Sequence, residues 1–158
     1  MAKAPVSKNC AATHCLCTDP LVREGEGVCE RGRWFHTICY KAREAQKEAV
    51  DIYYQQISRT VVMKQLQRTI NNLLYEKRCD PDLLVFALKY AVKNNYTVKS
   101  PYSLQYLVND YRIKEAYERY LKRKQAVQKI VGNIVYEEAE TPFTVASPTK
   151  GGFDKILN

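Results

Sequence analysis

The sequence has no long apolar run, no export-like start and only two histidines. No apolar run approaches the roughly 18 residues that a membrane-spanning helix requires, so we expect no membrane-spanning segment. The start Met1–Pro5 lacks the apolar core of a signal peptide, which predicts a cytoplasmic protein. A Walker motif, a glycine-rich dinucleotide loop and a recognisable Ser/His/Asp set are all missing from the sequence. We therefore expect a protein that is not an enzyme.

What the sequence does contain is typical of a folded, basic protein. Its 158 residues are 46% apolar and 27% charged, values that favour one domain of ordinary size with room for a small additional module. The chain carries 25 Lys+Arg against 17 Asp+Glu, a net charge of +8. This excess predicts an anionic partner.

The cysteines and histidines are concentrated near the N-terminus. Five of the six cysteines and both histidines lie within the first 39 residues, and Cys79 stands apart. A disulfide framework would also explain clustered cysteines, but it needs no histidines, and no export signal supplies an oxidising compartment. Reduced thiols interleaved with imidazoles favour zinc, and the surplus of thiolates favours a closed structural site over a catalytic one.

The spacing of these residues favours two pairs of ligands. His14 and Cys17 are separated by two residues, and His36 and Cys39 repeat the same gap after 18 intervening residues. Each gap lets one turn present two ligands to a single ion, and two pairs complete a tetrahedron. We therefore expect one structural Zn²⁺ per chain. The predicted ligands are His14, Cys17, His36 and Cys39, with Cys10 or Cys15 as alternatives to His14.

The segment around these ligands resembles a known class of zinc finger. The second ligand pair stands where a predicted hairpin strand, Arg33–Phe35, gives way to a helix. This arrangement resembles the treble-clef zinc fingers, including those of LIM domains and of poly(ADP-ribose) polymerase. The resemblance covers residues 10–45, with Asp19–Glu26 similar to their turn and strand after the knuckle. It implies a zinc-stapled β-hairpin module in which Cys29 points into the small core.

The remainder of the chain is predicted to be helical. Apolar residues recur at helical spacing, and Asp80-Pro81 is a strong start signal with proline at the first helical position. An apolar stripe from Ile113 to Ile134 runs along the last helix. The expected helices cover about 41–57, a run starting at Ser58 or Thr60 and reaching 74, 81–95, 101–108 and 110–136. The predicted fold class is therefore mainly α: a small zinc-stapled treble-clef β-hairpin module followed by a helical bundle of about four helices.

Positive charge is concentrated in this helical region. Residues 59–129 hold 15 Lys+Arg against six Asp+Glu, and the densest cluster lies at 119–124. Cations on a helix face favour contact with phosphates, because each neutralised phosphate releases counterions. We expect DNA to be the partner rather than RNA. The candidate nucleic-acid contacts are Arg112, Lys114, Arg119, Lys122, Arg123, Lys124 and Lys129.

A second resemblance points in the same direction. The aromatic-rich segment Ser100–Asp110, followed by a basic helix, makes residues 60–125 resemble the helical DnaD-type modules of bacterial and phage replication initiators. The resemblance implies binding to DNA and to partner proteins.

Four segments and two functions follow from these patterns. The function expected is that of a nucleic-acid-binding accessory protein of phage or bacterial replication or transcription. The alternative is an adaptor that docks on a polymerase or another host protein through the zinc module and the C-terminal tail. The oligomeric state stays open. The expected segments are a flexible arm at 1–9, the zinc module at 10–45, a basic helical domain at 46–136 and a flexible acidic tail at 137–158 with an apolar end.

Overall fold

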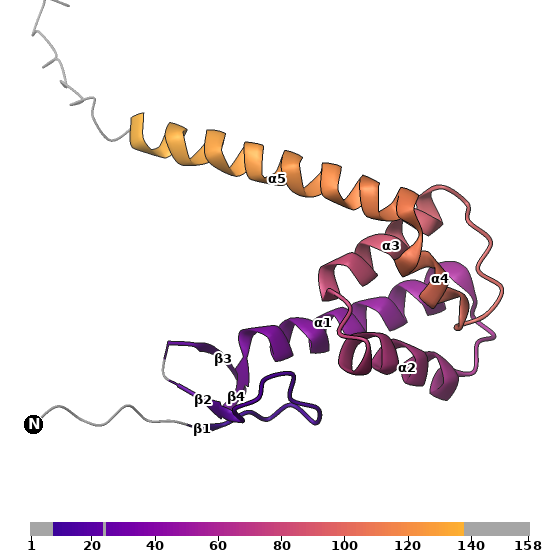
Figure 1. The fold of residues 1–158 in the computed structure, drawn as a ribbon, viewed down its shortest axis with the longest axis horizontal. Coiled ribbons are helices and arrows are strands. Elements are labelled where there is room, and N and C mark those ends of the chain that lie inside the picture. The colour runs from indigo at the N-terminus through magenta and orange to yellow at the C-terminus, as the bar shows by residue number, and fades with distance from the viewer. Residues whose placement is uncertain (1–7, 24, 138–158) are drawn as a thin grey trace, which may run out of the picture. The chain divides into compact units, whose positions relative to one another are not determined.

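The computed structural model describes residues 8–23 and 25–137, and within them the chain is mainly helical, as predicted (Figure 1). The predicted arm (1–9) and tail (137–158) lie outside the described part except for residues 8–9 and 137, and Glu137 belongs to the last helix rather than to a flexible tail. The elements are β1 (Lys8–Asn9), β2 (Leu21–Val22), β3 (Gly27–Glu30), β4 (Arg33–His36), α1 (Thr37–Ile52), the π-helical turn η1 (Tyr53–Ile57), α2 (Met63–Asn71), the π-helical turn η2 (Asn72–Glu76), α3 (Pro81–Lys93), α4 (Ser103–Asn109) and α5 (Tyr111–Glu137).

The N-terminal module consists of two antiparallel strand pairs. Strand β3 pairs with β4 so that Gly27 lies opposite His36, and the two-residue turn between them, Arg31-Gly32, has positive φ at both positions. Two successive left-handed residues match the twist of a tight hairpin, and glycine adopts this conformation without strain. The predicted hairpin is therefore confirmed.

Two details of this module differ from the sequence predictions. Lys8 and Asn9, expected in a flexible arm, form β1 and pair with β2. Cys29, expected in the small core, is exposed. The reason is strand alternation: Val28 lies opposite the buried Phe35, so the next residue along β3 points to the other face.

Helix α1 joins the module to the helical core. It starts directly after β4 and continues past the domain boundary expected between residues 45 and 46. Its buried face beyond the module is built from Ala45, Ala49 and Ile52, and small side chains let α2 and α3 pack closely against it. The largest fully buried aliphatic side chains of the helical core are Leu66, Ile70, Leu74, Leu84, Leu88, Leu104 and Ile113.

Helix starts agree with the sequence where local chemistry specifies them. Asp80 caps α3 by accepting a hydrogen bond from the Asp82 backbone N–H at 3.0 Å, and Pro81 takes the first helical position, as predicted. Helix α2 differs, because it begins after Val62 without a side-chain cap. Ser58 and Thr60, the predicted caps, lie before this start, and their hydroxyls contact each other at 3.4 Å.

The chain falls into two units, residues 1–120 and 121–158. In the first, Ile113 and Tyr117 of α5 are buried, and the Tyr117 ring lies 5.2 Å from that of Phe86. In the second, α5 continues to Glu137, and residues 122–131 are exposed. Among the described residues, no helix is both long enough and apolar enough to cross a membrane.

Replacing Asp80 by alanine is expected to reduce the free energy of unfolding by about 1–2 kcal/mol. The Asp80 carboxylate caps α3 and also accepts a hydrogen bond from the Tyr117 hydroxyl at 3.0 Å, so one substitution removes both contacts. Urea denaturation measures the change. Asp51→Ala, at an exposed position of α1, is the control and should change stability by less than about 0.5 kcal/mol. Equal effects of the two substitutions would contradict the role assigned to Asp80.

Candidate metal centre and nucleic-acid interface

Three cysteines and one histidine converge in the N-terminal module. One potential ligand atom from each of Cys10, Cys15, His36 and Cys39 lies within 4.8 Å of all the others. The Cys15 and Cys39 sulfurs are 3.8 Å apart, and His36 Nδ1 lies 3.4 Å from the first and 4.0 Å from the second. All six cysteines are free thiols. This cluster is therefore a set of donors that can hold a metal ion.

Long-range backbone pairing brings Cys10 close to His36 and Cys39. Cys10 directly follows β1, and its backbone N–H donates to the Pro20 carbonyl at 2.7 Å, which fixes it beside the start of β2. The next N–H, of Ala11, donates to the Trp34 carbonyl in β4 at 2.8 Å. His36 ends β4, and Cys39 lies in the first turn of α1. The hairpin, the β1 segment and the helix start thus meet at one point.

The hydrogen bonds of His36 determine which of its nitrogens is available. Its Nε2 lies 3.2 Å from the Leu21 carbonyl oxygen. Because a carbonyl can only accept, the Nε2–H must donate, and in the neutral ring Nδ1 keeps its lone pair. That lone pair belongs to the atom that faces the sulfurs of Cys15 and Cys39. Histidine ligands of metal ions are commonly oriented in this way, by a carbonyl that holds the other ring nitrogen.

The thiols lie in contrasting environments. Burial raises the pKa of the Cys39 thiol to about 12, although the Leu16 backbone N–H donates to its sulfur at 3.3 Å. For Cys10, burial acts in the same direction, but hydrogen bonds from the Ala12 and His36 backbones outweigh it and lower the pKa. A cation at the centre would favour the thiolate form of every cysteine in the cluster.

The cluster geometry fits a tetrahedral ion bound by sulfur and nitrogen. Sulfur ligands about 2.3 Å from a tetrahedral zinc ion lie about 3.8 Å apart, and a sulfur and a nitrogen ligand lie slightly closer. The Cys15–Cys39 distance of 3.8 Å and the Cys15–His36 distance of 3.4 Å agree with these values, and the Cys39–His36 distance of 4.0 Å is somewhat longer. Three thiols and one imidazole also form a closed set, with no position left for a substrate.

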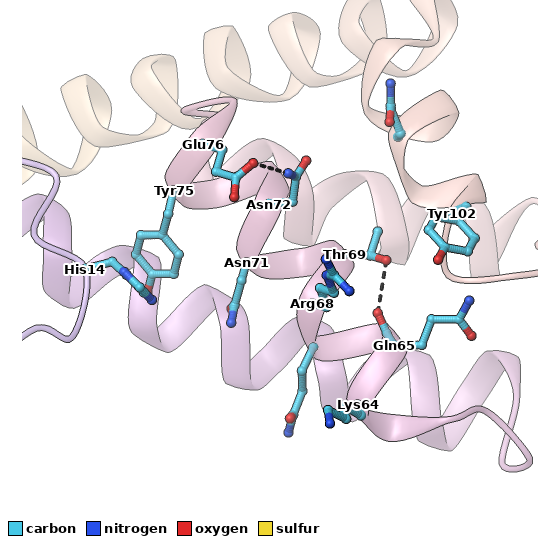
Figure 2. A pocket seen from close by; sticks show the side chains of 12 residues that line it. His14, Lys64, Gln65, Arg68, Thr69, Asn71, Asn72, Tyr75, Glu76 and Tyr102 are labelled. Carbon is cyan, nitrogen blue, oxygen red and sulfur yellow. Dashed lines mark hydrogen bonds between the residues drawn. The ribbon is translucent and has the colours of Figure 1, made fainter.

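The cluster shares His36 and Cys39 with the predicted ligand set and includes both alternatives, Cys10 and Cys15. The structure does not bring His14 or Cys17 into it. The His14 ring instead lies 5.4 Å from the ring of Tyr75 in η2 (Figure 2). Cys17 lies close by, and burial and the neighbouring Cys15 raise its pKa. The short extended segment before Cys10 was not predicted from the sequence. This segment pairs with β2 and thereby brings Cys10 to the cluster.

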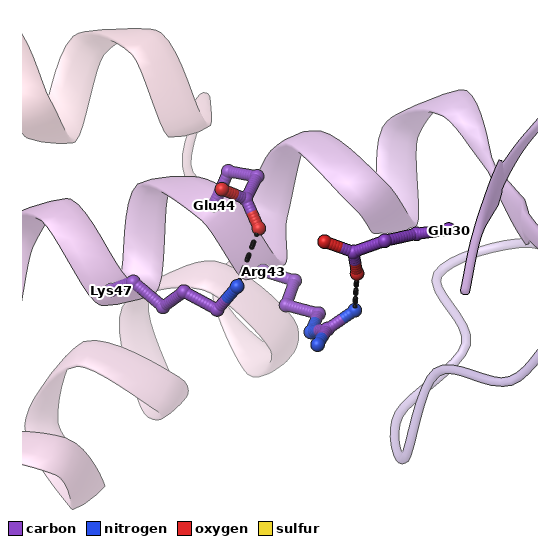
Figure 3. Close-up of polar contacts among 4 residues, drawn as sticks. All are labelled: Glu30, Arg43, Glu44 and Lys47. Atoms are coloured by element: carbon purple, nitrogen blue, oxygen red, sulfur yellow. Dashed lines mark hydrogen bonds and ion pairs between the residues drawn. The ribbon is translucent and has the colours of Figure 1, made fainter. Parts of the chain in front are cut away.

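One ion pair links the hairpin to α1 beside the cluster. The Arg43 guanidinium on α1 contacts Glu30 on β3 at 2.5 Å (Figure 3). The guanidinium also lies 5.0 Å from the Phe35 ring centroid. Both charged side chains are about one-third exposed, so the pair contributes little to stability.

All seven candidate nucleic-acid contacts are exposed on α5. Arg119 pairs with Glu115 at 3.1 Å, and Arg112 bonds to the Tyr111 hydroxyl at 3.0 Å. Within the described part of the chain, the other five have no ion-pair partner. These five are Lys114, Lys122, Arg123, Lys124 and Lys129.

Comparison of the chain with family models, with curated proteins and with solved structures gives no match.

Proposed function

We propose that Cys10, Cys15, His36 and Cys39 hold one structural Zn²⁺, and that residues 8–45 form a treble-clef-like module around it. The donor chemistry supports zinc, because soft thiolates with an imidazole in a tetrahedral set suit Zn²⁺ better than oxygen-seeking cations. The size of the module supports a structural role. Few of its side chains are buried, the main ones being Val22, Phe35, Cys39 and Ala42. So small a core gains its stability from a staple.

Zinc affinity is expected to fall steeply as the pH is lowered from about 8 to about 6, because binding must displace protons from the thiols. The pKa of Cys39 is raised by burial in the metal-free chain, so this thiol is protonated at neutral pH until the ion binds. Competition with a chelator at several pH values measures the affinity, and a weakly buffered titration measures the protons released. A pH-independent affinity would contradict thiolate ligation.

We further propose that the chain is a non-enzymatic accessory protein that binds nucleic acid, DNA in preference to RNA. The observation that carries this proposal is the set of exposed cations on α5. Between Tyr111 and Val131, seven Lys+Arg stand against two Glu, and six of the seven have no ion-pair partner among the described residues. Cationic side chains that form no ion pair are available to contact phosphates. Such contacts add affinity that does not depend on the nucleotide sequence.

A salt series of binding to mixed-sequence DNA and RNA tests this function. The proposal predicts tight binding at low salt, a steep decline of log affinity against log salt, and a higher affinity for DNA. Absence of binding to either nucleic acid at low salt would overturn it.

One observation favours the alternative function, an adaptor that docks on a polymerase or another protein. Val127, Ile130 and Val131 on α5 are each more than half exposed, at 58%, 60% and 53%. Apolar side chains exposed together on one helix are typical of a protein-binding face. Binding to a partner protein that survives high salt and is lost with Val127→Glu, without any nucleic-acid binding, would favour this alternative.

A further inference from the structure

A broad depression lies on the solvent side of α2 and η2 (Figure 2). It has a volume of about 950 Å³. His14 borders it on the side of the N-terminal module, and α4 contributes Gln105, with Tyr102 directly before that helix. The depression lies wholly within residues 1–120 and has no part in the metal cluster.

One polar stripe forms the floor of the depression. Lys64, Arg68, Asn71 and Tyr75 follow one another at intervals of four, three and four residues, which places them on one side of a helix. The opposite side carries buried apolar residues, including Leu66 and Ile70, so packing holds the stripe towards solvent. The stripe continues into the π-helical turn η2, a local distortion that is frequent at functional sites.

The depression contains amide groups without partners. The Asn71 side-chain oxygen is buried and accepts no hydrogen bond from any described residue. The side chains of Gln65, Gln67 and Gln105 likewise have no hydrogen-bond partner within the described ranges. A buried acceptor without a donor costs free energy, and a rotation of the Asn71 side chain that exposes this oxygen to a ligand N–H group would recover that cost.

The charged and aromatic side chains of the depression are also available to a ligand. Lys64 and Arg68 are exposed and form no ion pair with any described residue. Among the described residues of the lining, the only carboxylate is that of Glu76, which already accepts a hydrogen bond from the Asn72 amide. At the α4 side, Tyr102 is 61% exposed, so its ring is available for stacking.

We propose that this depression binds unpaired bases of a single-stranded nucleic acid. Lys64 and Arg68 contact the phosphates, a base stacks on Tyr102, and the Asn71 side chain rotates so that its oxygen accepts a hydrogen bond from an exocyclic amine. Stacking surfaces beside cations are the usual means of holding single strands, and free base edges are read by amide side chains. The proposal rests on the nucleic-acid function above and adds the form of nucleic acid recognised.

The Asn71 oxygen makes a base preference testable. Adenine and cytosine carry an exocyclic amine on the pairing edge, and thymine carries a carbonyl oxygen there instead. The zinc-loaded full chain is therefore expected to bind oligo(dA) and oligo(dC) more tightly than oligo(dT). In a duplex these amines are paired, so single strands should also be preferred over duplexes.

Fluorescence anisotropy with labelled oligo(dA), oligo(dC), oligo(dT) and a mixed-sequence duplex tests the proposal. Tyr102→Ala should weaken oligo(dA) binding by at least about 5-fold, the lower end of the loss when one stacked base is removed, and leave duplex binding unchanged. Asn71→Leu should abolish the preference over oligo(dT). Tyr106→Ala is the matched control, because Tyr106 is a 78% exposed tyrosine of α4 that does not line the depression.

The outcomes separate this inference from the function on which it rests. Failure of the chain to bind any nucleic acid at low salt would overturn both. In the other case, the chain binds all four probes, and Tyr102→Ala and Asn71→Leu bind them as strongly as the control Tyr106→Ala. That result would overturn the depression as a binding site and leave the nucleic-acid function in place. Since Tyr102 is largely exposed, its substitution tests the proposal even if Asn71→Leu impairs folding.

Discussion

Cys39→Ser is expected to release most of the bound zinc and to unfold the N-terminal module. Cys39 is fully buried at the junction of the hairpin and α1, and its sulfur accepts a hydrogen bond from the Leu16 backbone N–H. A serine oxygen is a poor substitute for a thiolate, and metal binding supplies much of the folding free energy of so small a module. Metal analysis and amide hydrogen exchange over residues 8–36 measure the two effects.

The remaining helices should stay folded in this variant. The hydrophobic core of α2, α3 and α4 contains no residue of the described strands, so its amide protection should persist. Two other cysteine substitutions serve as matched controls. Cys17→Ser and Cys79→Ser should both keep one zinc per chain, because neither residue belongs to the cluster. Release of zinc by Cys17→Ser, to the same extent as by Cys39→Ser, would contradict the proposed ligand set.

Reversing the charge at Lys122, Arg123 and Lys124 together is expected to lower nucleic-acid affinity by roughly tenfold or more at low salt. These residues are exposed, and no described carboxylate pairs with them, so their positive charges are available to phosphates. The reduction should be similar for all sequences. The slope of log affinity against log salt should fall by about one unit for each phosphate that the variant no longer neutralises.

A second triple variant separates local contacts from net charge. Reversing the charge at Lys41, Lys47 and Lys89 changes the net charge by the same amount at exposed positions of α1 and α3. Two of these lysines already pair with glutamates, so they are poor phosphate contacts. This control should retain most of the affinity and the salt slope. Equal reductions in the two variants would show that total charge, and not α5, determines binding.

The sequence predicted best those features of the fold that are determined by residues adjacent in the chain. The start of α3 is set by an aspartate cap and a proline within three residues, and the structure confirms it. The β3–β4 hairpin is set by the turn at Arg31-Gly32 and is confirmed as well. In both cases the signal and the structure lie in the same short segment, so no long-range contact can override it.

The composition of the metal cluster could not be derived in the same way. Cys10, Cys15 and Cys17 are close in sequence, and spacing favours the regular two-residue gap before Cys17. The structure brings Cys10 to the cluster through the pairing of β1 with β2, a contact between segments more than ten residues apart. His14 is directed instead to Tyr75, which lies about sixty residues further along the chain. Ligand spacing carries no information on either contact.

The stripe predicted along α5 shows a similar limit. Helical spacing placed Ile113, Tyr117, Val127 and Val131 on one face. The structure buries the first two against the core and leaves the last two exposed. Periodicity identifies the apolar side of a helix, but it does not tell where along its length another element covers that side.

X-ray absorption at the zinc edge of the purified full chain tests the central claim most directly. Zinc bound by Cys10, Cys15, His36 and Cys39 would show three sulfur neighbours at about 2.3 Å and one nitrogen neighbour at about 2.0 Å, with one zinc per chain. The set suggested by spacing alone, with His14 and Cys17, would show two of each. A first shell of two sulfurs and two nitrogens, or a chain without stoichiometric zinc, would contradict a structural zinc site built from three thiolates and His36.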